Sequence, residues 1–216
     1  MLLEQRADTM MAASLACLAG YNDAVGFRAL GGVFVSFMSG NSTRFAVDVS
    51  QPDWSPSTFL PLGIIALFLF GVIAGALVRE KIPRRKQVGV LTLVTAVIGI
   101  SAVVATNGQG EPAAALLAVA MGASNNVFVK QGEVSVALTY MTGTLVKLGQ
   151  RLAGRACGSR KPWLSNLILW LAFILGAVAG SLSHSLLRMQ ALWISFAFAA
   201  CLLCIDYVTS RVRGRA

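Results

Sequence analysis

Charged residues are scarce in this chain of 216 residues. Asp, Glu, Lys and Arg together make up 12% of it, whereas 56% is hydrophobic and the mean hydropathy is +0.71. So few charged residues cannot supply the polar surface that a water-soluble domain of this length needs. The composition therefore excludes a soluble enzyme, a secreted disulfide scaffold and a DNA-binding domain, and it predicts an integral membrane protein.

Residues that commonly carry catalysis or bind metals are also few. The chain has 1 histidine and 4 cysteines, and it contains neither a zinc-protease motif nor a nucleophile elbow. Cys201 and Cys204 form a C-x-x-C pair, but no histidine or second thiol pair stands nearby in the sequence. We therefore expect no metal site, no cofactor and no enzymatic activity.

The net charge of +9 is concentrated in loops. Three segments hold most of the basic residues: Arg79, Lys81, Arg84, Arg85 and Lys86; Arg151, Arg155, Arg160 and Lys161; and Arg211, Arg213 and Arg215. Cytoplasmic loops carry an excess of Lys and Arg, whereas loops 48–57 and 105–113 have none and are expected to face outside. The charge therefore indicates membrane topology, with both termini in the cytoplasm, and no nucleic-acid partner.

Eight apolar blocks follow one another along the chain. They cover about 9–27, 33–47, 58–78, 88–106, 112–129, 134–149, 163–186 and 189–209. A bilayer-spanning helix needs about 20 apolar residues, so the blocks at 58, 88, 163 and 189 are long enough. The blocks at 33 and 134 are short, and each follows a polar break that contains glycine.

The two halves of the chain repeat each other. Ser36–Gly40 matches Thr139–Gly143 in residue type at every position, and the same offset aligns three further pairs: Asn22 with Asn125, Asp23 with Asn126, and Arg44 with Lys147. Farther on, Gly71–Leu77 matches Gly176–Leu182. A repeat of this length predicts two related units, residues 1–110 and 111–216, within one membrane domain.

Combining the repeat with the charges predicts the fold. Loop 79–87 faces inside and loop 105–113 faces outside, so an odd number of crossings must lead from 113 to the basic loop at 151. We predict an all-α integral membrane protein of six transmembrane helices, built as two inverted three-helix repeats, with a short broken or re-entrant helix after the first helix of each repeat. If the short blocks also cross, each half has four crossings and the halves are parallel.

Several segments resemble those of a known family. They are Gly20–Ala24, Gly31–Asn41, Met121–Asn126 and Thr139–Leu145, which look like the patterned segments of the YoaK family of bacterial inner-membrane proteins, a domain of unknown function. The resemblance covers essentially the whole chain. It implies a multi-span protein of the bacterial inner membrane and names no substrate.

Polar residues inside the first apolar block of each half form the first candidate site. Asn22 and Asp23 interrupt one block, and Asn125 and Asn126 interrupt its counterpart. Unpaired polar groups are costly in hydrocarbon, and a carboxylate inside a membrane segment is a functional candidate by default. Asp23 is therefore expected to take up H⁺ or Na⁺ during transport; alternatively, all four side chains hydrogen-bond a broken helix.

A second constellation consists of Ser39, Gly40 and Asn41 with Thr142 and Gly143. A small hydroxyl residue beside glycine lets the backbone bend and expose its polar groups to a solute, and short helices aim their ends at the membrane midplane. The alternative is close helix packing around small residues.

Arg44 and Lys147 lie one helical turn beyond those glycines. They are candidates for contact with an anionic solute. Arg44 can instead pair with Asp48, or the side chains can snorkel to the headgroups, and snorkelling is the favoured interpretation because it is common for cations near helix ends.

Three classes of function remain at this stage. We expect a small secondary transporter that moves a small polar or anionic solute through a midplane site between the repeats. The alternative is a channel or a non-transporting scaffold that binds a partner, and a membrane enzyme is disfavoured because no reactive cluster is present. Besides the lipid bilayer and the solute, a homodimer is open, because Gly71-x-x-x-Gly75 and Gly176-x-x-x-Gly180 form helix-packing faces.

Overall fold

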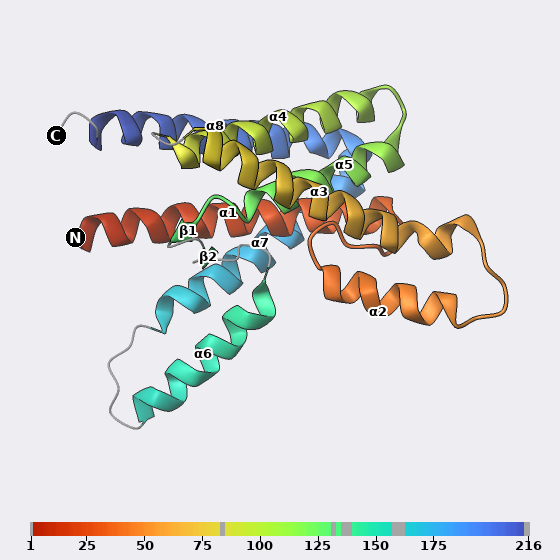
Figure 1. Cartoon of the computed structure of the whole chain (residues 1–216), viewed down its shortest axis with the longest axis horizontal. Helices are drawn as coiled ribbons and strands as arrows, with labels where there is room; N and C mark the ends of the chain where they lie inside the picture. The colour runs from red at the N-terminus through yellow and green to blue at the C-terminus, as the bar shows by residue number, and fades with distance from the viewer. Residues whose placement is uncertain (1, 83–84, 131–132, 135–139, 157–162, 214–216) are drawn as a thin grey trace.

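The computed structural model describes residues 2–82, 85–130, 133–134, 140–156 and 163–213. Their order is α1 (Leu2–Ala29), α2 (Met38–Val49), a 3-10 turn (Pro56–Phe59), α3 (Leu60–Lys81), α4 (Lys86–Thr106), α5 (Gly110–Ser124), β1 (Val129–Lys130), β2 (Glu133–Val134), α6 (Met141–Ala156), α7 (Leu164–Leu187), a 3-10 turn (Arg188–Ala191) and α8 (Leu192–Arg213). Figure 1 shows a bundle of helices with α2 and α6 beside it.

The structure confirms the expected helical character of the chain and the presence of helices suited to a membrane. Within the described part of the chain, three stretches are long and apolar enough to cross a membrane: Pro56–Lys81, Lys86–Thr106 and Leu164–Arg211. The last stretch contains both α7 and α8, joined by a 3-10 turn. The two-residue strands β1 and β2, which pair antiparallel, were not expected from the apolar pattern.

The long helices lie roughly along one direction (Figure 1). Both chain termini are at the same end of the bundle, and α1, α4 and α7 run away from that end while α3, α5 and α8 run back toward it. Helix α1 packs against α5, α7 and α8, and α5 packs against α3 and α4. Helix α1, which carries Asn22 and Asp23, and helix α5, which ends just before Asn125 and Asn126, thus contact each other inside the bundle.

Both short helices begin later than the sequence predicted. The prediction placed them at 33–47 and 134–149, but α2 begins at Met38 and α6 at Met141. In the first case Gly31 and Gly32 have φ of 58° and 89° and reverse the chain. The following segment is not helical; it buries Val33 and Val35 completely against the bundle.

Glycines allow two pairs of helices to pack closely: α1 with α7, and α3 with α5. An added Cβ on Gly176 would stand 2.9 Å from the Cα atom of Cys17, and one on Gly71 would stand 2.8 Å from the Cα atom of Val119. No side chain fits at that distance, so the backbones themselves touch. The same pattern recurs at three positions in each pair: Gly20, Gly176 and Gly180 in the first, and Gly71, Gly75 and Gly122 in the second.

Candidate functional site

The candidate site is built where the chain folds back onto α1. After α1 ends, the turn at Gly31 and Gly32 sends residues 33–36 back alongside the helix. Gly26 permits this approach, because an added Cβ there would meet the side chain of Val35. We call residues 33–36 the return segment.

Asp23 holds the return segment through its carboxylate. Its Oδ1 atom accepts hydrogen bonds from the backbone N–H groups of Val35, at 2.9 Å, and Ser36, at 2.8 Å. The side chain is buried, with 6% of its surface exposed. A buried carboxylate is costly unless donors compensate it, and these two amides supply that compensation.

Asn41, in the first turn of α2, binds the same segment. Its Oδ1 atom accepts a hydrogen bond from the Phe34 N–H at 2.9 Å, and its Nδ2 donates to the Phe34 carbonyl oxygen at 2.6 Å. The side chain thus pairs with both polar groups of one peptide, as a neighbouring strand would. Three consecutive amides, at positions 34 to 36, are therefore bound by Asn41 and Asp23.

Asn22 connects α1 to the other half of the chain. Its Oδ1 atom accepts a 2.6 Å hydrogen bond from the hydroxyl of Ser195 on α8. The preceding residue, Tyr21, donates to the Ala191 carbonyl oxygen at 2.8 Å. Asn22 is fully buried, and its Nδ2 has no hydrogen-bond partner among the residues that the structure describes. Such a buried donor without a partner is costly, because it has given up its hydrogen bonds to water.

In the second half, the corresponding amides contact α3 and α5. Asn126 donates from Nδ2 to the Val72 carbonyl oxygen at 3.0 Å, and Asn125 donates to the Met121 carbonyl oxygen at 3.0 Å. The guanidinium of Arg79 donates to the Asn126 carbonyl oxygen, also at 3.0 Å. These bonds hold the end of α5 on α3, so Asn125 and Asn126 belong to a different local group from Asn22 and Asp23.

The remaining small residues of the predicted site lie outside both groups. Ser39 and Thr142 are exposed. Gly40 is covered by the ring of Phe37, and Gly143 by the ring of Tyr140. Both glycines thus accommodate an aromatic side chain three residues earlier on the chain.

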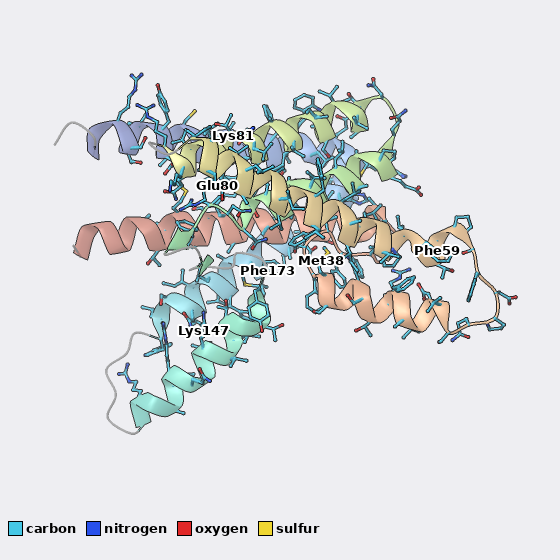
Figure 2. The ribbon with its side chains drawn as sticks, in the orientation of Figure 1. Met38, Phe59, Glu80, Lys81, Lys147 and Phe173 are labelled. Atoms are coloured by element: carbon cyan, nitrogen blue, oxygen red, sulfur yellow. The ribbon has the colours of Figure 1, made fainter. Side chains whose placement is uncertain are left out.

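The two basic candidates also differ from each other. Arg44 donates to the Gly31 carbonyl oxygen at 2.7 Å, and its Nε lies 3.5 Å from Oδ2 of Asp48. It therefore makes the i, i+4 pair that the sequence left open and also fixes the turn before the return segment. Lys147 is exposed on α6. Figure 2 shows it farther from the middle of the bundle than the labelled residues Met38 and Phe173.

The chemistry of the Asp23 group follows from its donors and its burial. A carboxylate that two amides already bind at one oxygen can take up a proton or a small cation at the other. Among the described residues, no three His, Cys, Asp or Glu side chains lie close enough together to hold a metal ion. Sequence reasoning missed Ser195 and Arg79 as partners, since a lone serine and a cation at the end of an apolar helix carry no distinctive spacing.

Comparisons with known proteins identify the family. The family described as "Protein of unknown function (DUF1275)" matches residues 11–205. UPF0700 transmembrane protein RA0705 of Rhizobium meliloti (strain 1021) is 35% identical over 185 residues, which cover 85% of this chain and 79% of the relative. No solved structure matches. An uncharacterised membrane family, as expected, is thereby confirmed, and the chain belongs to the DUF1275 family.

Proposed function

We propose that this protein is a small secondary transporter, in which residues 1–110 and 111–216 form two inverted three-helix repeats. It moves a small polar or anionic solute across the bacterial inner membrane. The observation that carries the proposal is that helices of one half pack closely on helices of the other. A glycine of α1, in the first half, lies against the backbone of α7, in the second half. A glycine of α5, in the second half, lies against the backbone of α3, in the first half.

The directions of the helices support the inverted arrangement. Helix α1 starts at the end of the bundle where both termini lie, whereas its counterpart α5 starts at the opposite end (Figure 1). The pairs α3 and α7, and α4 and α8, are opposed in the same way. Inverted repeats of this kind place a solute site between the halves and expose it alternately to the two sides of the membrane.

The polar groups on α1 support a site between the halves. Asp23 and Asn22 are buried on a helix that contacts α5, α7 and α8. Buried ionisable groups in membrane segments mark solute or ion pathways. In the proposed cycle, Asp23 binds the coupling H⁺ or Na⁺, and the free Nδ2 of Asn22 is a donor for the solute.

The inverted topology predicts where single cysteines react with a membrane-impermeant reagent. In a chain whose four native cysteines are replaced by serine, Lys81→Cys and Arg155→Cys should label only from the cytoplasm, and Gln109→Cys only from outside. All three side chains are exposed. Labelling of Arg155→Cys from the same side as Gln109→Cys would instead mean parallel halves.

The transporter proposal predicts saturable solute binding and flux. Purified protein screened by thermal shift against sugars, amino acids, organic acids and inorganic anions should be stabilised by one class, by about 2.7 kcal/mol at 100 times its Kd. The same class should then enter proteoliposomes with saturable kinetics. Flux that rises linearly with concentration would indicate a channel, and neither binding nor flux would indicate a scaffold.

A further inference from the structure

Two arginines share one aromatic ring at the end of the bundle that holds both termini (Figure 1). The guanidinium carbon of Arg85 lies 5.1 Å from the ring centre of Tyr207, and that of Arg211 lies 4.8 Å from it. Arg85 precedes α4, and Arg211 is in the last turn of α8. Because both approach the same ring, the two charges are within about one Debye length, about 10 Å at 0.1 M salt.

The start of α4 adds positive charge to this place. Arg85 is the N-cap residue and Lys86 follows it, while the first turn contains no acidic residue and the cap makes no side-chain hydrogen bond. The N-terminal end of a helix carries a partial positive charge and unpaired N–H groups, so cations here are unfavourable in the absence of an anion.

Asp206, which precedes Tyr207 on α8, is buried, and Glu80 lies between Arg79 and Lys81 in the last turn of α3. Arg85 and Arg211 are both exposed, whereas Tyr207 is half-buried. The two guanidinium groups are thus held in place by the ring and are open to a ligand.

We propose that Arg85, Lys86, Arg211 and the ring of Tyr207 form a binding site for the phosphate of an anionic phospholipid headgroup. Guanidinium groups match phosphate oxygens in geometry and charge. Val208, which is three residues before Arg211 on the same face of α8, is 59% exposed and offers apolar contact for the acyl chains. The site is separate from Asp23 and does not depend on the proposed transport.

Native mass spectrometry in a nonionic detergent tests the proposal, with phosphatidylglycerol and phosphatidylcholine supplied in equal amounts. The wild-type protein is expected to retain phosphatidylglycerol preferentially. The double variant Arg85→Gln/Arg211→Gln should weaken that binding by about tenfold or more, because each basic side chain at a membrane surface attracts anionic lipid appreciably. Tyr207→Leu, which keeps both charges and removes the ring, should weaken it in the same direction.

A matched control separates a specific site from overall charge. Lys147→Gln/Arg155→Gln removes the same charge from α6, and Arg155 also lies over a ring, that of Trp163, at 6.0 Å. This control should retain phosphatidylglycerol within about twofold of wild type. Equal weakening by both double variants, or by neither, would overturn the proposal. Inorganic phosphate at the lipid concentration should not compete; displacement would assign the site to free phosphate instead of lipid.

Discussion

Replacing Gly176 with leucine is expected to prevent α1 from packing on α7 and to leave little folded protein in the membrane. The backbone of Cys17 occupies the space that a side chain would need, with its Cα 2.9 Å from the position of an added Cβ. Because backbone rather than a flexible side chain must move, we expect a loss of about 3 kcal/mol or more. Yield and melting temperature of the detergent-extracted protein measure this effect.

Other glycines of the chain provide the controls for this experiment. Gly71→Leu should be as damaging, since it disrupts the equivalent contact between α3 and α5. Gly63→Leu and Gly149→Leu should be tolerated, because an added Cβ at either position has no atom within 4 Å. If Gly176→Leu were as stable as Gly149→Leu, backbone contact between the helices would not be what holds the halves together.

Changing Asp23 to asparagine is expected to abolish coupled transport while the protein stays folded. Asparagine keeps an oxygen that can accept the hydrogen bonds from Val35 and Ser36, but it loses the negative charge and the ability to take up a proton or cation. Asp23→Leu removes the acceptor as well. It should destabilise the protein by about 1–3 kcal/mol for each buried N–H that it leaves unpaired.

Flux into proteoliposomes and the melting temperature separate these two effects. Asp53→Asn is the matched control, because Asp53 is an exposed carboxylate in the loop before α3; it should change neither quantity. Unchanged flux in Asp23→Asn would remove the carboxylate from the transport cycle and leave it only a structural role at the return segment.

The sequence identified the positions with unusual backbone or burial but not their partners. Asp23 and the paired glycines could be found, because a carboxylate in an apolar block and a repeated Gly-x-x-x-Gly motif can both be recognised in the amino-acid sequence. The partners of Asp23 are backbone amides, which have no side-chain signal. The partner of Asn22 is a lone serine 173 positions away.

The repeat was informative about the halves and misleading about individual residues. The sequence alignment pairs Asp23 with Asn126. In the structure, the residues of α1 and α5 that make equivalent glycine contacts are one position closer in number than in that alignment, so Asp23 corresponds to Asn125. Helix α5 ends at Ser124, while α1 continues to Ala29. Similar sequence therefore places these side chains on different neighbours. The start of α2 was wrong for a related reason: apolar residues such as Val33 are buried in an extended segment as well as in a helix.

The packing of α1 on α7 has a consequence for how the protein is made. Helix α1 ends at Ala29, and α7 begins only at Leu164. At about 5–20 residues per second, the ribosome needs on the order of ten seconds to synthesise the intervening chain. Throughout that delay the glycine face of α1 lacks its final neighbour α7, whereas the Val35 and Ser36 amides that bind Asp23 are made soon after α1. We therefore expect the insertion machinery to shield the glycine face until α7 arrives.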